Sequence, residues 1–239
     1  MTTKLTNLLT YTVILASALV FASCDYSEDP GPLQEVEMEF NETDFDRLEI
    51  GDALHIDVEQ GNFFEISVRG DRRNVNDLEV FKEGSTLIVR FDEQENRRYD
   101  TYVTITMPSI AAANFSGASS SRISGFDDLT KFDFYLSGAS VSQIDIVANE
   151  FDAVISGASV LNARGSASSF DVEVSGASVL KAFNLPVVTA DVLATGASHA
   201  SLTVADKLNA VASGASSVTY RGNPTVTSDV SGSSAVRHE

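Results

Sequence analysis

The sequence carries a repeating unit, one copy of which reads Phe151-Asp152-Ala153-Val154-Ile155-Ser156-Gly157-Ala158-Ser159. The motif Ser-Gly-Ala-Ser recurs through the second half of the chain, and two close variants extend the series toward its C-terminal end. The glycines of these copies are Gly117, Gly138, Gly157, Gly176, Gly196, Gly214 and Gly232, separated by 21, 19, 19, 20, 18 and 18 residues. A near-constant period of this length is typical of a solenoid, in which each repeat forms one rung.

Apolar and polar residues alternate before each glycine, as in the stretch 170–174 (Phe-Asp-Val-Glu-Val) before Gly176. The position six places before the glycine is held in successive copies by Phe132, Phe151, Phe170, Ala190, Leu208 and Val226. A second alternation follows the glycine, as at Leu180 and Ala182. A period of two indicates a strand with one buried face. Each repeat is therefore predicted to be two short strands that meet at Ser-Gly-Ala-Ser.

The residues of the motif suit a tight corner between two strands. Glycine reaches positive φ or allows close backbone approach, and alanine and serine are narrow enough for rungs stacked about 4.8 Å apart. The missing leucine consensus excludes a leucine-rich repeat, and the period of two excludes helical repeats. We predict an all-β fold, a parallel β-solenoid (β-helix) with rungs of 18–21 residues.

The region before the repeats also follows the strand period. Clean alternation occurs in residues 54–58, 64–68, 86–91 and 102–107. We interpret residues 41–110 as less regular first rungs of the same solenoid, which continues through the Ser-Gly-Ala-Ser repeats of residues 111–239. This makes residues 41–239 a single domain. A separate small β-domain is the alternative for the first part.

The N-terminal segment predicts secretion. Lys4 is the only charged side chain before Asp25, and an apolar run extends from Leu8 to Ala22. This run is shorter than the roughly 20 residues of a membrane-spanning helix. A basic start, a short apolar region and small residues at its end are typical of a signal peptide, which we assign to residues 1–23.

Cys24 is predicted to be the site of lipid attachment. The segment Ala22-Ser23-Cys24 resembles a bacterial lipobox, although Phe21 stands where leucine is usual. As the only cysteine of the chain, Cys24 has no intramolecular disulfide partner. Its acyl chains would anchor the protein to a membrane, which we expect to be contacted through this anchor only. The alternative is a small apolar residue within the signal peptide.

Residues 24–40 are predicted to be a lipidated acidic linker. Pro30-Gly31-Pro32 prevents a helix, and the acids on both sides favour an extended, solvated chain. Ser27-Glu28-Asp29 resembles the acidic signal that directs some Gram-negative lipoproteins to the outer face of the outer membrane. An ordinary acidic linker explains the same three residues.

The net charge of −18 limits the choice of partners. Because a surface this acidic repels the phosphate backbone of nucleic acids, we expect no nucleic-acid partner. Acidic membrane surfaces are disfavoured for the same reason. Cations, basic proteins and neutral glycans remain open.

Several motifs together carry a resemblance to a known family. In chain order they are Phe45-Asp46-Arg47-Leu48-Glu49-Ile50, Gln60-Gly61, Gly84, Leu87-Ile88-Val89 and Met107-Pro108, followed by the Ser-Gly-Ala-Ser units. Over roughly residues 40–235 the chain resembles the family described as putative auto-transporter adhesin, head GIN domain. The resemblance implies a right-handed parallel β-helix and, as in many members, a lipoprotein. It supplies no catalytic residues.

The acidic residues and histidines do not predict an active site. The acids recur with the rungs, forming a predicted column of Asp133, Asp152, Asp171 and Asp191, and no Lys, Arg or His recurs beside them. We expect this column to be solvated or bonded to turn amides, with a strip for a cation or polar ligand as the alternative. His55, His199 and His238 show no ligand spacing. We predict no catalytic residue, no metal site, no cofactor and no enzymatic activity.

These observations predict a non-catalytic lipoprotein of the cell envelope, held at the outer membrane of a Gram-negative bacterium. Its body is expected to be a surface adhesion or ligand-binding module for a glycan or a protein. A structural spacer without a ligand is the alternative, and a β-helix enzyme acting on polysaccharides is a further one. Within the repeats, Tyr135 is the one aromatic residue expected to face outward.

Overall fold

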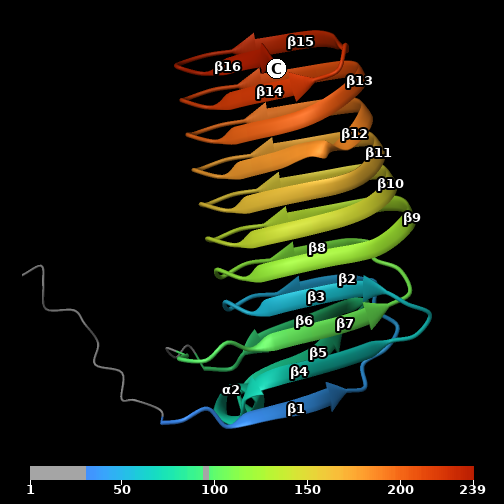
Figure 1. Ribbon diagram of the computed structural model, residues 1–239, viewed down its shortest axis with the longest axis vertical. Helices are drawn as coiled ribbons and strands as arrows, with labels where there is room; N and C mark the ends of the chain where they lie inside the picture. The colour runs from blue at the N-terminus through green and yellow to red at the C-terminus, as the bar shows by residue number, and fades with distance from the viewer. Residues whose placement is uncertain (1–30, 94–96) are drawn as a thin grey trace, which may run out of the picture. The chain divides into compact units, whose positions relative to one another are not determined.

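The computed structural model describes residues 31–93 and 97–239 of the chain. From Leu33 to Glu239 they form one unit, a right-handed parallel β-helix of about seven turns (Figure 1). The fold predicted from the repeats is confirmed. The predicted signal peptide and Cys24 lie outside the described residues.

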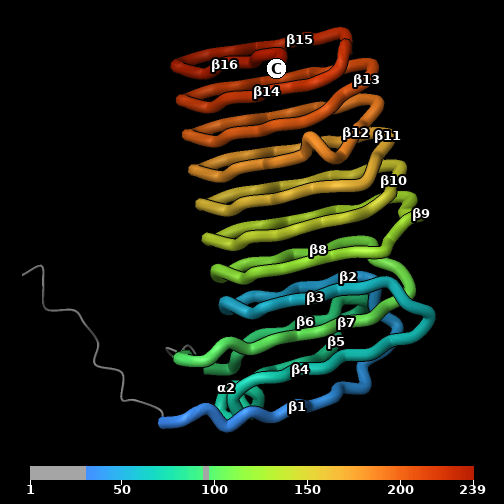
Figure 2. Tube along the Cα trace, viewed as in Figure 1, coloured from blue at the N-terminus to red at the C-terminus, as the bar shows by residue number. Residues whose placement is uncertain are grey.

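Five long strands make up the repeats, and each one bends from one side of the solenoid to the other (Figure 2). They are β9 (Ser120–Leu136), β10 (Val141–Ile155), β11 (Val160–Val174), β12 (Val179–Ala194) and β13 (His199–Ala212). Neighbouring strands pair in parallel. We call the part of each strand that follows a Ser-Gly-Ala-Ser corner the first face, as in residues 141–145. The part that precedes the next corner, as in residues 150–155, is the second face.

The core consists of the alternating residues that the repeats predict to point inward. Phe132, Phe151 and Phe170 are fully buried and occupy equivalent positions in adjacent rungs. Their rings stack with centroids 5.6 Å and 4.9 Å apart and planes inclined by 18° and 12°. Parallel pairing in register places like residues above one another, and this repetition produces the stack.

The glycine of each corner is required by both of the constraints expected from the sequence. Gly157 and Gly176 have φ angles of +76° and +72°, a region that glycine enters without strain. A Cβ atom on Gly176 would also overlap the carbonyl oxygen of Gly157. The amide of Ala177 donates to that same oxygen at 2.8 Å, which holds the two corners together.

The second serine of the motif points into the solenoid. These serines form a buried column of Ser119, Ser140, Ser159, Ser178, Ser198 and Ser216. The hydroxyl of Ser140 donates to the carbonyl of Ser137 at 2.8 Å, and that of Ser119 donates to Ser140 Oγ at 3.2 Å. In these rungs a small hydroxyl thus supplies hydrogen bonds beneath the corner, whereas the buried Ser159 Oγ has no partner among the described residues.

The region before the repeats joins the same sheet, as predicted, but its strands are not stacked in chain order. Its parallel strands are β2 (Arg47–Ile50), β3 (His55–Gln60), β6 (Thr86–Phe91), β7 (Tyr102–Met107) and β8 (Ala112–Phe115). Strand β2 lies between β6 and β8, and β3 lies between β7 and β9. In Figure 1 the cyan pair β2–β3 accordingly lies between green strands that come later in the sequence.

The prediction of parallel rungs is wrong at the N-terminal end of the solenoid. Strands β4 (Glu65–Asp71) and β5 (Leu78–Glu83), joined by helix α2 (Arg72–Asn76), pair antiparallel with β7 and β6. The chain reverses between β3 and β4 and again in the two-residue turn between β5 and β6, so β4 and β5 run opposite to their neighbours. Connections this short join antiparallel strands, whereas parallel strands need a longer crossover.

The predicted linker 24–40 also requires correction, because its last residues form β1 (Glu35–Phe40), which pairs antiparallel with β4. Val36 and Phe40 pack against the core. The acids Glu35, Glu37 and Glu39 alternate with these apolar residues, so they occupy the outer positions of an edge strand.

Asp71 caps the N-terminus of helix α2, and its buried carboxylate accepts hydrogen bonds from the amides of Arg73 and Gln34 at 3.0 and 2.9 Å. The Arg73 guanidinium, 2.7 Å away, contributes most to holding the pKa of Asp71 well below its usual range. Across the described residues, no helix is long and apolar enough to span a membrane.

The last rung departs from the predicted burial. It consists of β14 (Ser217–Arg221), β15 (Thr225–Val230) and β16 (Ala235–His238), where β15 pairs with β13 and β16 with β14. Val226 is only half-buried, and Ser228 and Val230 are exposed, although the repeat places all three inward. No further strand among residues 31–93 and 97–239 covers them, so their inward positions are partly or fully exposed.

Candidate ligand-binding site

Outward side chains on the first face are aligned in rows across neighbouring strands, because the strands pair in register. The strands concerned lie in the order β1, β4, β7, β3, β9, β10. Across them, the first row consists of Glu37, Arg69, Tyr102, His55, Ser120 and Val141. The second row, two residues along each strand, consists of Glu39, Ser67, Thr104, Asp57, Arg122 and Gln143.

A groove of about 330 Å³ lies over these two rows, and we call it the first groove. Side chains from all six strands line it, including Arg69, Tyr102, His55, Asp57 and Arg122. It therefore combines aromatic rings with groups that donate and accept hydrogen bonds. The small polar side chains of Ser67, Thr104 and Ser120 also line the groove.

Three side chains of the first row form a stack. The Arg69 guanidinium carbon lies 4.7 Å from the centroid of the Tyr102 ring, and the His55 ring lies 4.9 Å from it with planes inclined by 24°. Glu35 holds Arg69 in place through an ion pair of 2.6 Å. The far side of His55 faces the next strand, where the row continues with the small Ser120. The stack thus ends at an imidazole ring beside a small residue.

Two opposite charges of the second row lie next to this end of the stack. Asp57 and Arg122 are paired positions on β3 and β9. The Oδ1 atom of Asp57 is buried and accepts no hydrogen bond from residues 31–93 or 97–239. Arg122 is exposed and forms no ion pair within the same residues. The Asp57 carboxylate lines the first groove and is only half-buried as a side chain, so it is a hydrogen-bond acceptor that a ligand in the groove can use.

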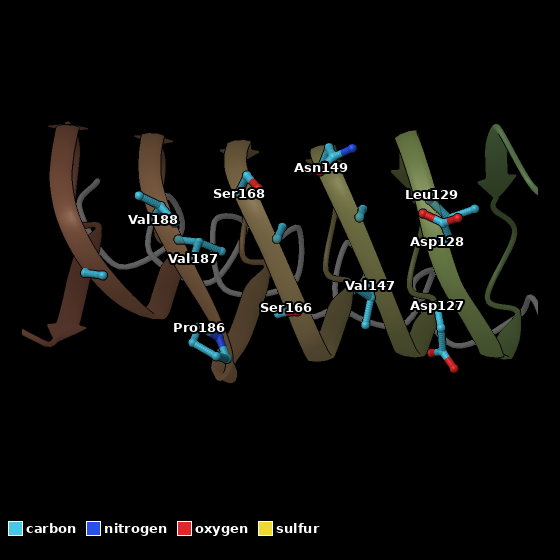
Figure 3. A pocket seen from close by; sticks show the side chains of 13 residues that line it. Asp127, Asp128, Leu129, Val147, Asn149, Ser166, Ser168, Pro186, Val187 and Val188 are labelled. Carbon is cyan, nitrogen blue, oxygen red and sulfur yellow. The ribbon is translucent and has the colours of Figure 1, made fainter.

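A second groove, of about 400 Å³, follows the bend between the two faces (Figure 3). Asp127 and Asp128 lie at one end of it, and Pro186 lies toward the other, where β12 departs from its register with β13. Its lining is otherwise aliphatic or small and polar, with Val147 and Val188 exposed. This lining includes no aromatic ring and no cationic side chain, so the first groove offers the more varied chemistry.

The predicted aspartate column exists on the second face, where Asp133, Asp152, Asp171 and Asp191 are aligned in register. Asn209 donates to Asp191 at 2.6 Å. Asp171 has no such partner among the described side chains. Partial burial and the charges of Asp152 and Asp191 raise its pKa.

Sequence reasoning missed Lys131, which neutralises one end of this column. Its ammonium lies 2.6 Å from Asp152, 2.9 Å from Glu150 and 3.3 Å from Asp133. Asp152 and Glu150, in that order, raise the pKa of Lys131 above its usual range. The signal was available, because Lys131 precedes Asp133 by two residues on the same side of the strand.

The three histidines lie in different surroundings. His55 belongs to the first groove, His199 contacts the hydroxyls of Ser201 and Ser217, and His238 contacts the carbonyl of Gly222. Within the part of the chain that the structure describes, no group of three His, Cys, Asp or Glu residues is arranged to hold a metal ion.

Sequence reasoning also missed the aromatic stack. Tyr135 is 48% exposed on the second face, in agreement with its predicted outward position. His55 and Tyr102, however, belong to the irregular rungs, and the alternation of residues 102–107 is the only sequence signal that Tyr102 faces outward.

The described rungs define a β-solenoid protein, and the match to a family model supplies the family. Residues 44–224 match the model described as putative auto-transporter adhesin, head GIN domain. The chain belongs to this family. A comparison with curated proteins found no match.

Solved structures of similar fold include proteins of Bacteroides and Parabacteroides species. A protein of Bacteroides fragilis NCTC 9343 described as a putative adhesin has a TM-score of 0.78 and 18% identity, covering 86% of this chain and 97% of its own. A putative adhesin of Parabacteroides distasonis ATCC 8503 has a TM-score of 0.70 and 18% identity, covering 87% and 98%. A putative lipid binding protein of the same strain has a TM-score of 0.64 and 18% identity, covering 86% and 96%. At these identities the likeness shows the fold.

Proposed function

We propose that the chain is a non-catalytic adhesion module of the bacterial cell surface that binds its ligand in the first groove. The observation that carries this proposal is the juxtaposition, on one face, of the Tyr102–His55 stack with Asp57 and Arg122. Binding sites of this kind combine aromatic surface with a few placed polar groups. Membership of an adhesin-like family supports the same assignment.

A binding role fits the separation of the acidic groups better than a catalytic one. Glu37 and Asp57 are the two carboxylates that line the first groove. Their strands are three spacings apart, about 14 Å at the backbone. Glycosidases hold their two carboxyl groups closer, about 5–9.5 Å apart. Glu37 also accepts a hydrogen bond from Ser67 at 2.7 Å, which occupies one of its oxygens.

A polar ligand on the outer surface fits better than a lipid inside the solenoid. One neighbour of similar fold is described as a lipid binding protein. In this chain the interior of the repeats is filled by buried side chains, including Phe132, Phe151 and Phe170. A ligand therefore has to bind on the outside, where the first groove is lined mainly by polar and charged groups.

Attachment of the module to the outer membrane through Cys24 is part of the proposal and is supported by the lipobox-like segment that ends at this residue. Replacing the acylated sulfur removes the anchor, so Cys24→Ser is expected to leave uncleaved precursor and to abolish detergent-phase partitioning. Mature-sized protein that still partitions into detergent would refute the anchor. Protease added to intact cells should remove the body, and full protection would contradict surface exposure.

The binding role is tested with the full-length chain purified in detergent and applied to arrays of glycans and of surface and matrix proteins. Ser120→Tyr fills the first groove from an exposed position, and Ser168→Tyr fills the second groove in the same way. We expect binding that Ser120→Tyr abolishes and Ser168→Tyr leaves intact. Binding that only Ser168→Tyr abolishes, or no binding to either array, would refute the proposal.

A further inference from the structure

We infer that the first groove binds a neutral saccharide, with one sugar ring placed over Ser120 between His55 and the strand of Val141. This inference rests on the proposed function and names the class of its ligand. It is carried by the geometry of the first row and by the unpaired charges of the second row.

The first row leaves room for one ring beside His55. Arg69, Tyr102 and His55 stack at intervals of 4.7 and 4.9 Å, which is about one strand spacing. The next place in this stack lies over Ser120, whose side chain is too small to fill it. Val141 follows on β10, two strand spacings from His55, or about 9.6 Å at the backbone. A ring about as thick as an aromatic side chain would continue the stack at the empty place.

The face of a sugar ring suits this place because it presents C–H groups that pack against an aromatic surface. The ring of His55 is positioned by Tyr102 on its other side, and Asp100 Oδ1 lies 3.7 Å from His55 Nε2. The imidazole is therefore braced before any ligand arrives, which limits the entropy lost on binding.

The second row supplies partners for hydroxyl groups next to the same place. The Asp57 carboxylate lines the groove and accepts no hydrogen bond from the described residues, and the Arg122 guanidinium beside it carries several N–H groups without a carboxylate partner within the same range. A hydroxyl group both donates and accepts. Neighbouring hydroxyls of one sugar can therefore donate to Asp57 and accept from Arg122.

The pair of opposite charges also selects for a neutral ligand. An anionic ligand would approach Asp57 on a protein whose net charge is −18, and a cationic one would approach Arg122 and Arg69. A purely apolar ring would cover the Asp57 carboxylate without supplying a donor, which is unfavourable. A neutral polyhydroxylated ring is repelled neither by Asp57 nor by the two arginines, and its hydroxyl groups can donate to Asp57.

The test is calorimetric titration of the full-length chain in detergent with cellohexaose, maltohexaose, mannohexaose and xylohexaose, with hexagalacturonate as the acidic comparison. We expect at least one neutral hexaose to bind. His55→Ala and Asp57→Asn should each weaken its binding by roughly tenfold or more. His55→Phe, which keeps a flat ring, should stay within about threefold of the parent affinity.

His199→Ala is the matched control, because His199 occupies the same row five strands from His55 and should leave the affinity unchanged. Equal melting temperatures of the variants confirm folding. Three results would overturn the inference: binding of hexagalacturonate alone, hexaose binding unaffected by His55→Ala and Asp57→Asn, or no hexaose binding at all. If no hexaose binds but a protein ligand does, and Ser120→Tyr blocks binding of that protein, the proposed function stands and only the saccharide is refuted.

Discussion

The ring of Phe170 lies 4.9 Å from the ring of Phe151, with the two planes inclined by only 12°. Both side chains are buried, and they occupy paired positions on β11 and β10. This contact shows how the repeat stabilises the solenoid. The same position of the repeat is buried in successive rungs from Phe132 to Leu208, and neighbouring copies pack against each other.

Phe151→Ala tests this packing. The variant removes a ring held between Phe132 and Phe170, and the cavity should cost about 3–5 kcal/mol of unfolding free energy. Tyr135→Ala is the control, because this exposed aromatic should change stability by about 0.5 kcal/mol or less. Chemical denaturation measures both. Equal losses at the two positions would show that the assigned strand phase is wrong.

A turn glycine, Gly84 between β5 and β6, and a corner glycine, Gly176, allow conformational strain and backbone overlap to be separated. Gly84 has a φ of +61° with open space around its Cβ position, whereas a Cβ on Gly176 would overlap Gly157 O. Gly84→Ala should therefore cost about 1–2 kcal/mol from strain alone. Gly176→Ala should cost about 1–3 kcal/mol more. A Gly176→Ala variant that unfolds at the same denaturant concentration as Gly84→Ala would exclude a tight corner.

Asp171→Asn is expected to stabilise the protein at neutral pH. The pKa of Asp171 is raised in the folded state, so its ionised form is disfavoured there. Its destabilising effect is present above the folded pKa and disappears as the pH falls below the unfolded value of about 3.9. The variant should therefore melt at a higher temperature than the parent at pH 7 and at the same temperature near pH 3.

Asp152→Asn is the matched control for this substitution, because Asp152 is neutralised by Lys131 at 2.6 Å. It should lower the melting temperature at pH 7 or leave it unchanged. If both variants raise the melting temperature equally, the ion pair of Lys131 does not relieve the repulsion within the column.

The repeats could be predicted from the sequence because every rung presents the same pattern. The period of two assigns Phe132, Phe151 and Phe170 to the interior, and parallel stacking in register needs no further information. The prediction fails where this repetition ends. Val230 is exposed because no further strand within the described part of the chain packs against its rung.

The N-terminal part could be predicted only as a set of strands. Its stacking depends on pairs far apart in the sequence, such as β2 with β8, and a local pattern does not encode such pairs. The candidate site is a consequence of this arrangement. His55 and Tyr102 become neighbours only because β3 pairs with β7, so the sequence alone could not bring them together.

The location of the ligand is the central claim, and a single tryptophan tests it most directly. The chain contains no tryptophan, so Tyr102→Trp places one fluorescent reporter in the first groove, and Val188→Trp places one in the second. The neutral hexaose bound by the parent should change the emission of Tyr102→Trp and leave that of Val188→Trp unchanged. A change from Val188→Trp with none from Tyr102→Trp would contradict the assignment of the first groove as the binding site.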